Sequence, residues 1–236
     1  MTTAVVAIAS CLDRAIVVEG DPDGGVLAAR FGLSKEPGLT TLAAGARAGS
    51  PEPIAIEAHQ QELPGGVEVI VGPASPESAT ALWRSSGPRV ASTLADVAHT
   101  MPVLVDAGRL SPVAPTASLL EVADLLVVVV RPILEDLHAL AARTQSFRSH
   151  AARLVVLMVG EQPYGPADVA EQLGVQVIGV LASDPRAADA LAGRAWMSRG
   201  LRRSSLARSA RSVAERLVQS APQGLHSTES VPMVGH

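Results

Sequence analysis

Short runs of continuous apolar residues, rich in β-branched side chains, recur along the chain and are bounded by turn or charged residues. Continuous rather than alternating apolarity is typical of strands that are buried on both faces, as in a parallel sheet. These runs predict strands at residues 15–19, 67–71, 103–106, 125–130, 154–159 and 175–180.

Between the apolar runs lie helix-length segments in which Ala, Leu and Arg recur with a period of about 3.6 residues. They predict helices at residues 2–12, 25–31, 39–48, 76–85, 90–99, 116–122, 134–149, 166–173, 186–192 and 201–219. Strands that alternate with helices predict an α/β fold, a doubly wound and mostly parallel sheet with helices on both faces. We expect one domain over residues 1–220 and a polar, disordered tail at residues 221–236.

Composition narrows the class of protein. Of the 236 residues, 47% are hydrophobic and 18% charged, which excludes a disordered chain. The longest apolar runs are far shorter than the roughly 20 residues that a membrane-spanning helix needs. The net charge of -4 gives no overall attraction for nucleic acid. A single cysteine, Cys11, and the lack of a basic leader segment predict a cytoplasmic protein.

The last predicted helix, at residues 201–219, is basic on one side and apolar on the other. Such a helix can contact an anionic membrane or the phosphates of DNA. Its apolar face is small and contains no Phe or Trp, which favours a helix packed on the sheet with a solvated arginine face. Contact with DNA or a membrane is the alternative. The arginines are Arg202, Arg203, Arg208, Arg211 and Arg216.

Acidic residues follow two of the predicted strands, and in an open α/β sheet ligands bind beyond the carboxyl ends of the strands. The strand at residues 15–19 ends in Glu19 and leads to Asp21, and the strand at residues 103–106 ends in Asp106. An apolar strand that ends in Asp matches the Walker B arrangement, in which the carboxylate reaches Mg²⁺ directly or through water. Turn formation is the alternative role for such carboxylates.

Several segments together resemble the ParA/MinD ATPases, and they occur in that family's order from Thr2 to about Leu217. Residues 19–33, with Glu-Gly-Asp-Pro and then Gly-Gly, are similar to the family's strand and switch segment. Residues 37–39, 123–132 and 174–185 resemble later segments. The resemblance implies a P-loop NTPase fold, ATP and Mg²⁺ as cofactors, and a homodimer. It also implies an ATP-dependent spatial regulator, acting in chromosome partitioning or in positioning cell division or another assembly.

The resemblance also implies roles for individual residues. Thr2 would bind Mg²⁺ and Thr3 the α-phosphate, at the start of the first helix. Asp21 would position the attacking water, and Asp106 would bind Mg²⁺ through water. For Thr2 and Thr3 the alternative is an ordinary helix N-cap.

Asp184 and Pro185 would line the adenine side of the same nucleotide. Where the family often has an asparagine that reads the base, this sequence has Gly160 and Glu161. Base specificity is therefore not implied.

One part of the family pattern is missing. Met1, Thr2 and Thr3 resemble the two threonines that follow the family's phosphate loop, whereas the first strand and the glycine-rich loop are absent. Lys35, the only lysine, matches neither lysine of that loop. A start codon assigned too far downstream and a genuinely degenerate member both account for this pattern.

The missing segment has two expected consequences. The sheet would lack an interior strand, which leaves two neighbouring strands with unpaired backbone groups or forces them to close up. ATP hydrolysis would be weak or absent, because no lysine neutralises the phosphates. The alternative function is therefore a pseudo-ATPase scaffold that does not hydrolyse ATP and recruits a partner in pilus or secretion assembly.

Overall fold

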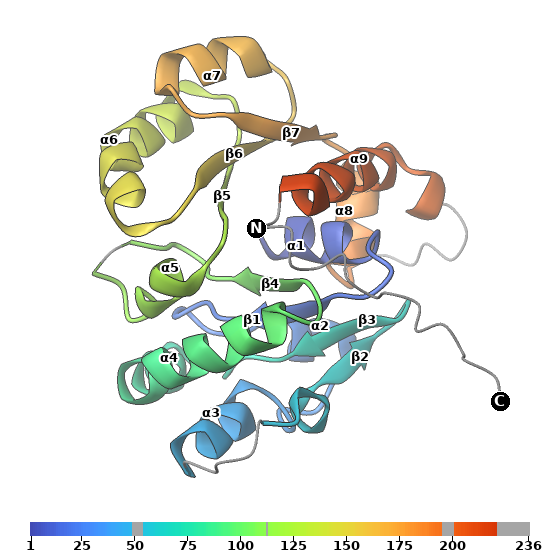
Figure 1. Ribbon diagram of the computed structural model, residues 1–236. Helices are drawn as coiled ribbons and strands as arrows, with labels where there is room; N and C mark the ends of the chain where they lie inside the picture. The colour runs from blue at the N-terminus through green and yellow to red at the C-terminus, as the bar shows by residue number, and fades with distance from the viewer. Residues whose placement is uncertain (49–53, 112, 195–200, 221–236) are drawn as a thin grey trace, which may run out of the picture.

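The computed structural model of the chain describes residues 1–48, 54–111, 113–194 and 201–220 (Figure 1). The predicted tail at residues 221–236 lies outside this part. The strands form two sheets, one with the order β2-β3-β1-β4 and one with the order β5-β6-β7. Their bounds are β1 Ile16–Glu19, β2 Gln61–Leu63, β3 Val67–Ile70, β4 Val103–Asp106, β5 Leu126–Val130, β6 Leu154–Val159 and β7 Val177–Leu181.

The predicted fold class is confirmed, since all strand pairs are parallel except β2 with β3. Each of the six predicted strands is present within two residues of its expected bounds. The prediction missed β2, which lies between the predicted helix at residues 39–48 and the predicted strand at residues 67–71. Two of its three residues, Gln61 and Glu62, are polar, so no apolar run marks this edge strand.

Helices cover both faces of the sheets (Figure 1). Their bounds are α1 Thr2–Ala9, α2 Leu27–Phe31, α3 Leu39–Ala48, α4 Pro76–Ala98, α5 Ser118–Val122, α6 Leu134–His150, α7 Pro166–Leu173, α8 Pro185–Leu191 and α9 Ser205–Ser220, with 3₁₀ turns η1 Ile56–His59 and η2 Leu201–Arg203. Helices α3 and α4 pack on one face of the first sheet, and α1 and α2 on the other. None of the helices in the described residues is long and apolar enough to cross a membrane.

Helix α4 corrects the prediction of two separate helices at residues 76–85 and 90–99. The sequence Gly87-Pro88 reads as a helix breaker, yet one helix runs through it. Pro88 is exposed, so the distortion faces solvent. On the other side Trp83 and Val90 are fully buried in the core, and this burial outweighs the local preference for a break.

The sheet is interrupted between β4 and β5, as the missing interior strand led us to expect. In the part of the chain that the structure describes, β4 is hydrogen-bonded to β1 alone and β5 to β6 alone. The two strands have therefore not closed up, and each leaves one edge without a strand partner.

Helix α1 connects the two sheets through side chains. Ala4, Ala7 and Ile8 belong to the apolar cluster of the second sheet, whereas Val6 and Ala9 belong to a cluster of the first sheet. Leu104 of β4 packs against both clusters. Packing on this one face therefore joins the two sheets where backbone pairing does not.

Helix α9 packs on the sheet, which confirms the favoured interpretation of the basic helix. Its buried residues are Leu206, Ala210, Val213 and Ala214, and they contact β7 and α1. Arg208 and Arg211 are exposed, and Arg216 donates a hydrogen bond to the Ile178 carbonyl at 3.1 Å. Because the apolar face is used inside the molecule, only the arginine side remains for contact with DNA or a membrane.

Replacing Pro88 by Ala is expected to stabilise the protein. The substitution restores a helical N–H donor in α4, partly offset by the greater freedom of the unfolded chain. We expect a gain of about 1–2 kcal/mol in the free energy of unfolding, measured with urea. Pro76→Ala is the control, because Pro76 stands in the first turn, where no intrahelical donor is lost. An unchanged or lower stability of Pro88→Ala would contradict the expectation.

Candidate functional site at the carboxyl edge of the first sheet

Two buried carboxylates lie side by side where β1 and β4 end. Glu19 is the register partner of Asp106, and each is 3% exposed. Both strands are apolar up to these last residues, so the parallel pairing brings the two acidic ends to one place. The edge of the sheet therefore concentrates negative charge in a partly dehydrated environment.

Glu19 binds three backbone N–H groups. Its Oε1 accepts hydrogen bonds from Val26 at 2.7 Å and Leu27 at 2.8 Å, and its Oε2 accepts one from Gly72 at 3.1 Å. A Cβ at Gly25 would lie 2.6 Å from Oε2, so only glycine permits this approach. Glu19 thereby ties the loop after β1, the start of α2 and the end of β3 together.

The pKa of the Glu19 carboxyl is raised by burial, and the negative charge of Asp106 raises it further. The three backbone N–H groups act in the opposite direction. No role was assigned to Glu19 from the sequence. The sequence contains a feature that indicates this role of Glu19. An apolar strand that ends in Glu and runs into a glycine-rich loop suggests a carboxylate that binds the N–H groups of that loop.

Asp21 lies against the turn that follows β4. Its Oδ1 accepts a hydrogen bond from the Asp23 N–H at 2.8 Å. Gly108 has a left-handed φ of 61°, and a Cβ there would collide with the Asp21 carboxylate. Burial raises the pKa of Asp21, as do the charges of Asp106 and Asp23, whereas the N–H of Asp23 and, less strongly, the amino group of Met1 lower it. The amino group of Met1 is therefore close enough to Asp21 for its charge to act on that carboxylate.

Asp106 is less fully hydrogen-bonded than Glu19. Within the described residues the only hydrogen bond to its carboxylate comes from the Gly108 N–H at 3.4 Å. A carboxylate at a strand end with unused acceptor capacity is a suitable ligand for a hydrated cation. The structure thus brings the predicted residues Asp21 and Asp106 together.

Thr2 and Thr3 are the first two residues of α1, and both are half-buried. The helix N-cap is Met1 and makes no side-chain hydrogen bond, so the alternative role of the threonines as N-caps is wrong. The predicted roles of Thr2 in binding Mg²⁺ and of Thr3 in binding phosphate stay predictions.

Asp184 and Pro185 begin α8, at the carboxyl end of β7 on the second sheet. Asp184 is the N-cap, accepting hydrogen bonds from the Ala187 N–H at 3.1 Å and the Ser205 hydroxyl at 2.9 Å. The pKa of Asp184 is lowered, first by the N–H of Ala187 and then by Ser205. The carboxylate thus holds α8 to the start of α9, and the predicted contact with adenine stays a prediction.

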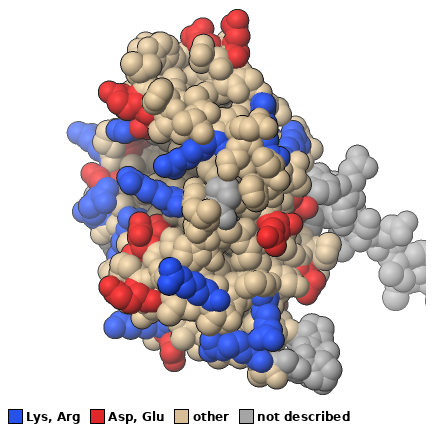
Figure 2. Space-filling view, turned by 90° about the vertical axis from the view of Figure 1, so that its left-hand side faces the viewer, with Lys and Arg blue, Asp and Glu red and all other residues tan. Residues whose placement is uncertain are grey.

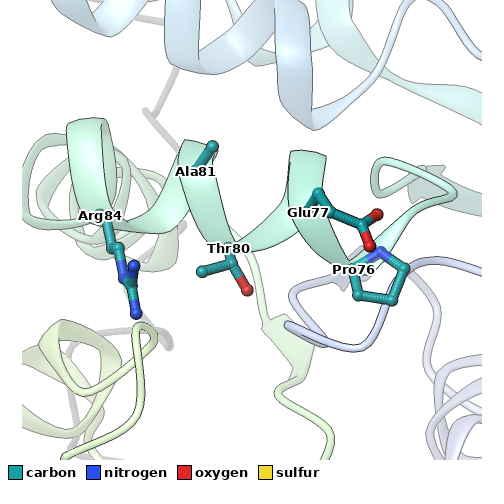
Figure 3. A pocket seen from close by; sticks show the side chains of 5 residues that line it. All are labelled: Pro76, Glu77, Thr80, Ala81 and Arg84. Carbon is teal, nitrogen blue, oxygen red and sulfur yellow. The ribbon is translucent and has the colours of Figure 1, made fainter.

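A surface depression of about 400 Å³ lies beside the first turns of α4. Figure 3 shows its lining of Pro76, Glu77, Thr80, Ala81 and Arg84, all from this one helix. It includes none of the predicted site residues, and a surface hollow lined by a single helix cannot surround a ligand. On the face shown in Figure 2, basic and acidic side chains are interspersed rather than gathered by sign. The acidic edge, formed by Glu19, Asp21 and Asp106 where β1 and β4 end, thus remains the candidate site.

The described residues fall short of a complete metal or phosphate site. Within them, no three His, Cys, Asp or Glu side chains form a group that could hold a metal ion. The ion pairs found in this part of the chain are Arg131 with Asp136 and Arg194 with Asp189, and neither includes Glu19, Asp21 or Asp106. The acidic edge therefore has no salt-bridged cation among the described side chains.

The parallel α/β architecture with acidic strand ends at its carboxyl edge defines a P-loop NTPase-like fold. More particularly, the chain has the fold of the ParA/MinD ATPases. A ParA family ATPase from Chlorobium tepidum has a TM-score of 0.69 and 18% identity, covering 92% of this chain and 91% of that one. No protein-family model matches the sequence, and no curated protein matches it.

Two MinD structures show the same likeness. MinD from Pyrococcus horikoshii, solved in complex with Mg-ADP, has a TM-score of 0.67 and 16% identity over 92% of this chain and 88% of that one. A MinC:MinD complex from Aquifex aeolicus has a TM-score of 0.65 and 14% identity over 100% and 93%. At these identities the likeness establishes the fold, as the resemblance in the sequence predicted.

Glu19→Gln tests the buried carboxylate through the pH dependence of stability. The folded-state pKa of Glu19 lies above 4.5, so its contribution is fully present below that pH and is lost as the pH rises through the folded-state pKa. Glutamine does not titrate. From about pH 4 to about pH 8, the free energy of unfolding of the variant should therefore rise relative to wild type. Parallel pH profiles in urea unfolding would contradict this account of Glu19.

Asp184→Ala tests the cap of α8. Removal of the acceptor leaves the Ala187 N–H and the Ser205 hydroxyl without their partner, so we expect Tm to fall by a few degrees. Asp184→Asn keeps a side-chain acceptor and should recover most of the loss. Equal loss in both variants, measured by thermal unfolding, would show that the charge rather than the cap matters.

Proposed function

We propose that the protein is a nucleotide-responsive spatial regulator of the ParA/MinD kind, which binds ATP and Mg²⁺ at the acidic edge and acts in the cytoplasm as a homodimer. Its role would be chromosome partitioning, or the positioning of cell division or another assembly. The meeting of Asp21 and Asp106 beside the start of α1 carries the proposal. The Mg-ADP in the structure of Pyrococcus horikoshii MinD supports the class of ligand, and the MinC:MinD complex supports a protein partner.

The residues at the acidic edge are suited to bind the Mg²⁺ that accompanies ATP, but they are not suited to bind its phosphates. Asp106, Asp21 and Thr2 offer carboxylate and hydroxyl oxygens, which Mg²⁺ prefers directly or through water. A triphosphate needs lysine or a concave run of backbone N–H groups. No described lysine or arginine forms an ion pair with the acidic edge. We therefore infer weak nucleotide binding and weak or absent hydrolysis.

The chain's own residues would then act as follows. Glu19 fixes the loop that carries Asp21, so that a change at the edge is transmitted to α2 and to the end of β3. Asp21 would orient a water molecule, and Asp106 would hold the hydration shell of the metal. When bound, Mg²⁺ would neutralise negative charge on the phosphates.

A second candidate is a pseudo-ATPase scaffold that keeps this fold and recruits a partner in pilus or secretion assembly. Lys35 favours it, because the only lysine of the chain is exposed in the segment between α2 and α3 and forms no ion pair with the acidic edge. A scaffold needs the surface of the fold and not a phosphate site.

Thermal unfolding with and without MgATP separates the two candidates. For the regulator we expect millimolar MgATP to raise the Tm of the wild-type chain, with a dissociation constant of about 1 mM by calorimetry, and Asp106→Asn to lose most of the shift. Phosphate release should stay at the level of the blank. Asp124→Asn is the control, because Asp124 is exposed at the opposite end of the strands, ahead of β5.

Two outcomes would overturn the regulator. If MgATP leaves the Tm of the folded wild type unchanged, nucleotide binding fails and the scaffold stands. If Asp106→Asn and Asp124→Asn respond like wild type, the nucleotide binds elsewhere and the acidic edge is the wrong site.

A further inference from the structure

The outer side of the first turns of α4 carries a surface depression that no other element lines among the described residues. Its lining residues recur at intervals of three and four along the helix, so they form one stripe, which we call the α4 stripe. These residues are Pro76, Glu77, Thr80, Ala81 and Arg84 (Figure 3). The inner side of the helix, with Leu82 and Trp83, is buried in the core. The α4 stripe is therefore open to another molecule.

Charged side chains stand towards the two ends of the α4 stripe, and short ones lie between them. Glu77 and Arg84 are exposed, and neither takes part in an ion pair among the described residues. Thr80 and Ala81 are short enough to let another helix approach to the spacing of about 8–10 Å between the axes of packed helices. The stripe thus combines a small centre with opposite charges on either side of it.

The order of these residues makes the α4 stripe complementary to itself. In an antiparallel pair with a two-fold axis between Thr80 and Ala81, Glu77 of each copy faces Arg84 of the other, because both residues are equally far from that axis. The same symmetry sets Thr80 against Ala81, so no bulky side chain holds the two helices apart. A parallel pair in register would set Glu77 against Glu77, so charge selects the antiparallel pair. Such a contact is isologous and closes on two molecules.

Val113 adds an apolar side chain beside the Arg84 end of the α4 stripe. It is 93% exposed, in the turn that precedes α5. This turn packs on α4, since a Cβ at Gly87 would lie 3.7 Å from the Pro115 carbonyl oxygen and 3.1 Å from Ser118 Oγ. Gly87 is one helical turn beyond Arg84. A second copy on the stripe would therefore find an apolar side chain next to each of the two ion pairs.

We propose that the α4 stripe is a contact between two copies of this chain, paired antiparallel about an axis between Thr80 and Ala81. The contact involves only a short stretch of helix and one turn, less than the surface that a stable dimer buries. It is therefore weak, with a dissociation constant of about 100 µM, and weaker still at high salt. It does not rest on the proposed function, because nothing in it requires a nucleotide.

Sedimentation without nucleotide tests the contact through charge reversal. The wild-type chain should self-associate at about 100 µM in low salt. Glu77→Arg makes both ends of the stripe basic and Arg84→Glu makes both acidic, so each variant alone should associate at least about tenfold more weakly. An equimolar mixture should associate like wild type, because each ion pair then joins one chain of each kind. The combined variant Glu77→Arg/Arg84→Glu should do the same.

Arg89→Glu is the matched control, because Arg89 is exposed on α4 but lies off the stripe. It should associate like wild type, and an equal loss there would assign the effect to net charge and overturn the contact. A monomeric wild type, single reversals that associate like wild type, or a mixture that stays monomeric would also overturn it. Binding of MgATP is measured separately. A chain that binds MgATP and stays monomeric overturns this contact and leaves the nucleotide site standing.

Cross-linking provides a second test that does not depend on charge. In a Cys11→Ser background, Ala81→Cys places one thiol per chain beside the two-fold axis. Ser92→Cys places it about three turns away on the same helix, and both positions are exposed. A short bis-maleimide should join Ala81→Cys chains into covalent dimers at least about tenfold faster than Ser92→Cys chains. Equal rates for the two variants would overturn the proposed axis.

Discussion

Packing of α1 across the interval between β4 and β5 is the contact on which the arrangement of the two sheets depends. In a parallel sheet, backbone hydrogen bonds normally fix each interior strand against a neighbour on both sides. Here that ladder stops at β4 and begins again at β5. Helix α1 contacts one sheet through Ala4, Ala7 and Ile8 and the other through Val6 and Ala9. The apolar side chains of one short helix therefore replace a row of backbone hydrogen bonds.

The two buried carboxylates of the acidic edge, Glu19 and Asp106, differ in how fully they are hydrogen-bonded within the chain. Glu19 is buried and needs its three N–H donors, because an unpaired buried carboxylate is strongly unfavourable. Asp106 is its neighbour on the next strand, and it raises the pKa of Glu19 by repulsion. The structural carboxylate is thus satisfied from within the chain, while the adjacent one keeps acceptor capacity for something outside it. This difference between the two neighbours is the basis of the cation site proposed for the edge.

Sequence patterns predicted most of the fold and only part of the site. Buried strands such as residues 154–159 are continuous apolar runs, so their position could be recognised without tertiary information. The short edge strand at Gln61 and the continuous helix through Gly87-Pro88 could not, because both depend on contacts made far along the chain. Asp21 and Asp106 could be predicted to lie near one another, because both follow strands of a parallel sheet and such strands end at the same edge. It could not show that Asp184 is engaged by Ala187 and Ser205, since that contact joins two helices.

The packing of α9 against α1 also bears on the order in which the protein is made. One apolar cluster contains both Ala4 and Ala214, so the first helix and the last complete the same part of the core. Contacts of such long sequence separation form late, because a long loop must be closed before they contribute. During synthesis α1 can cover only part of this side of β5, β6 and β7, and the rest stays uncovered until α9 has been made. The apolar cluster of the second sheet is therefore complete only after α9 has been synthesised, and chaperones can bind its uncovered part until then.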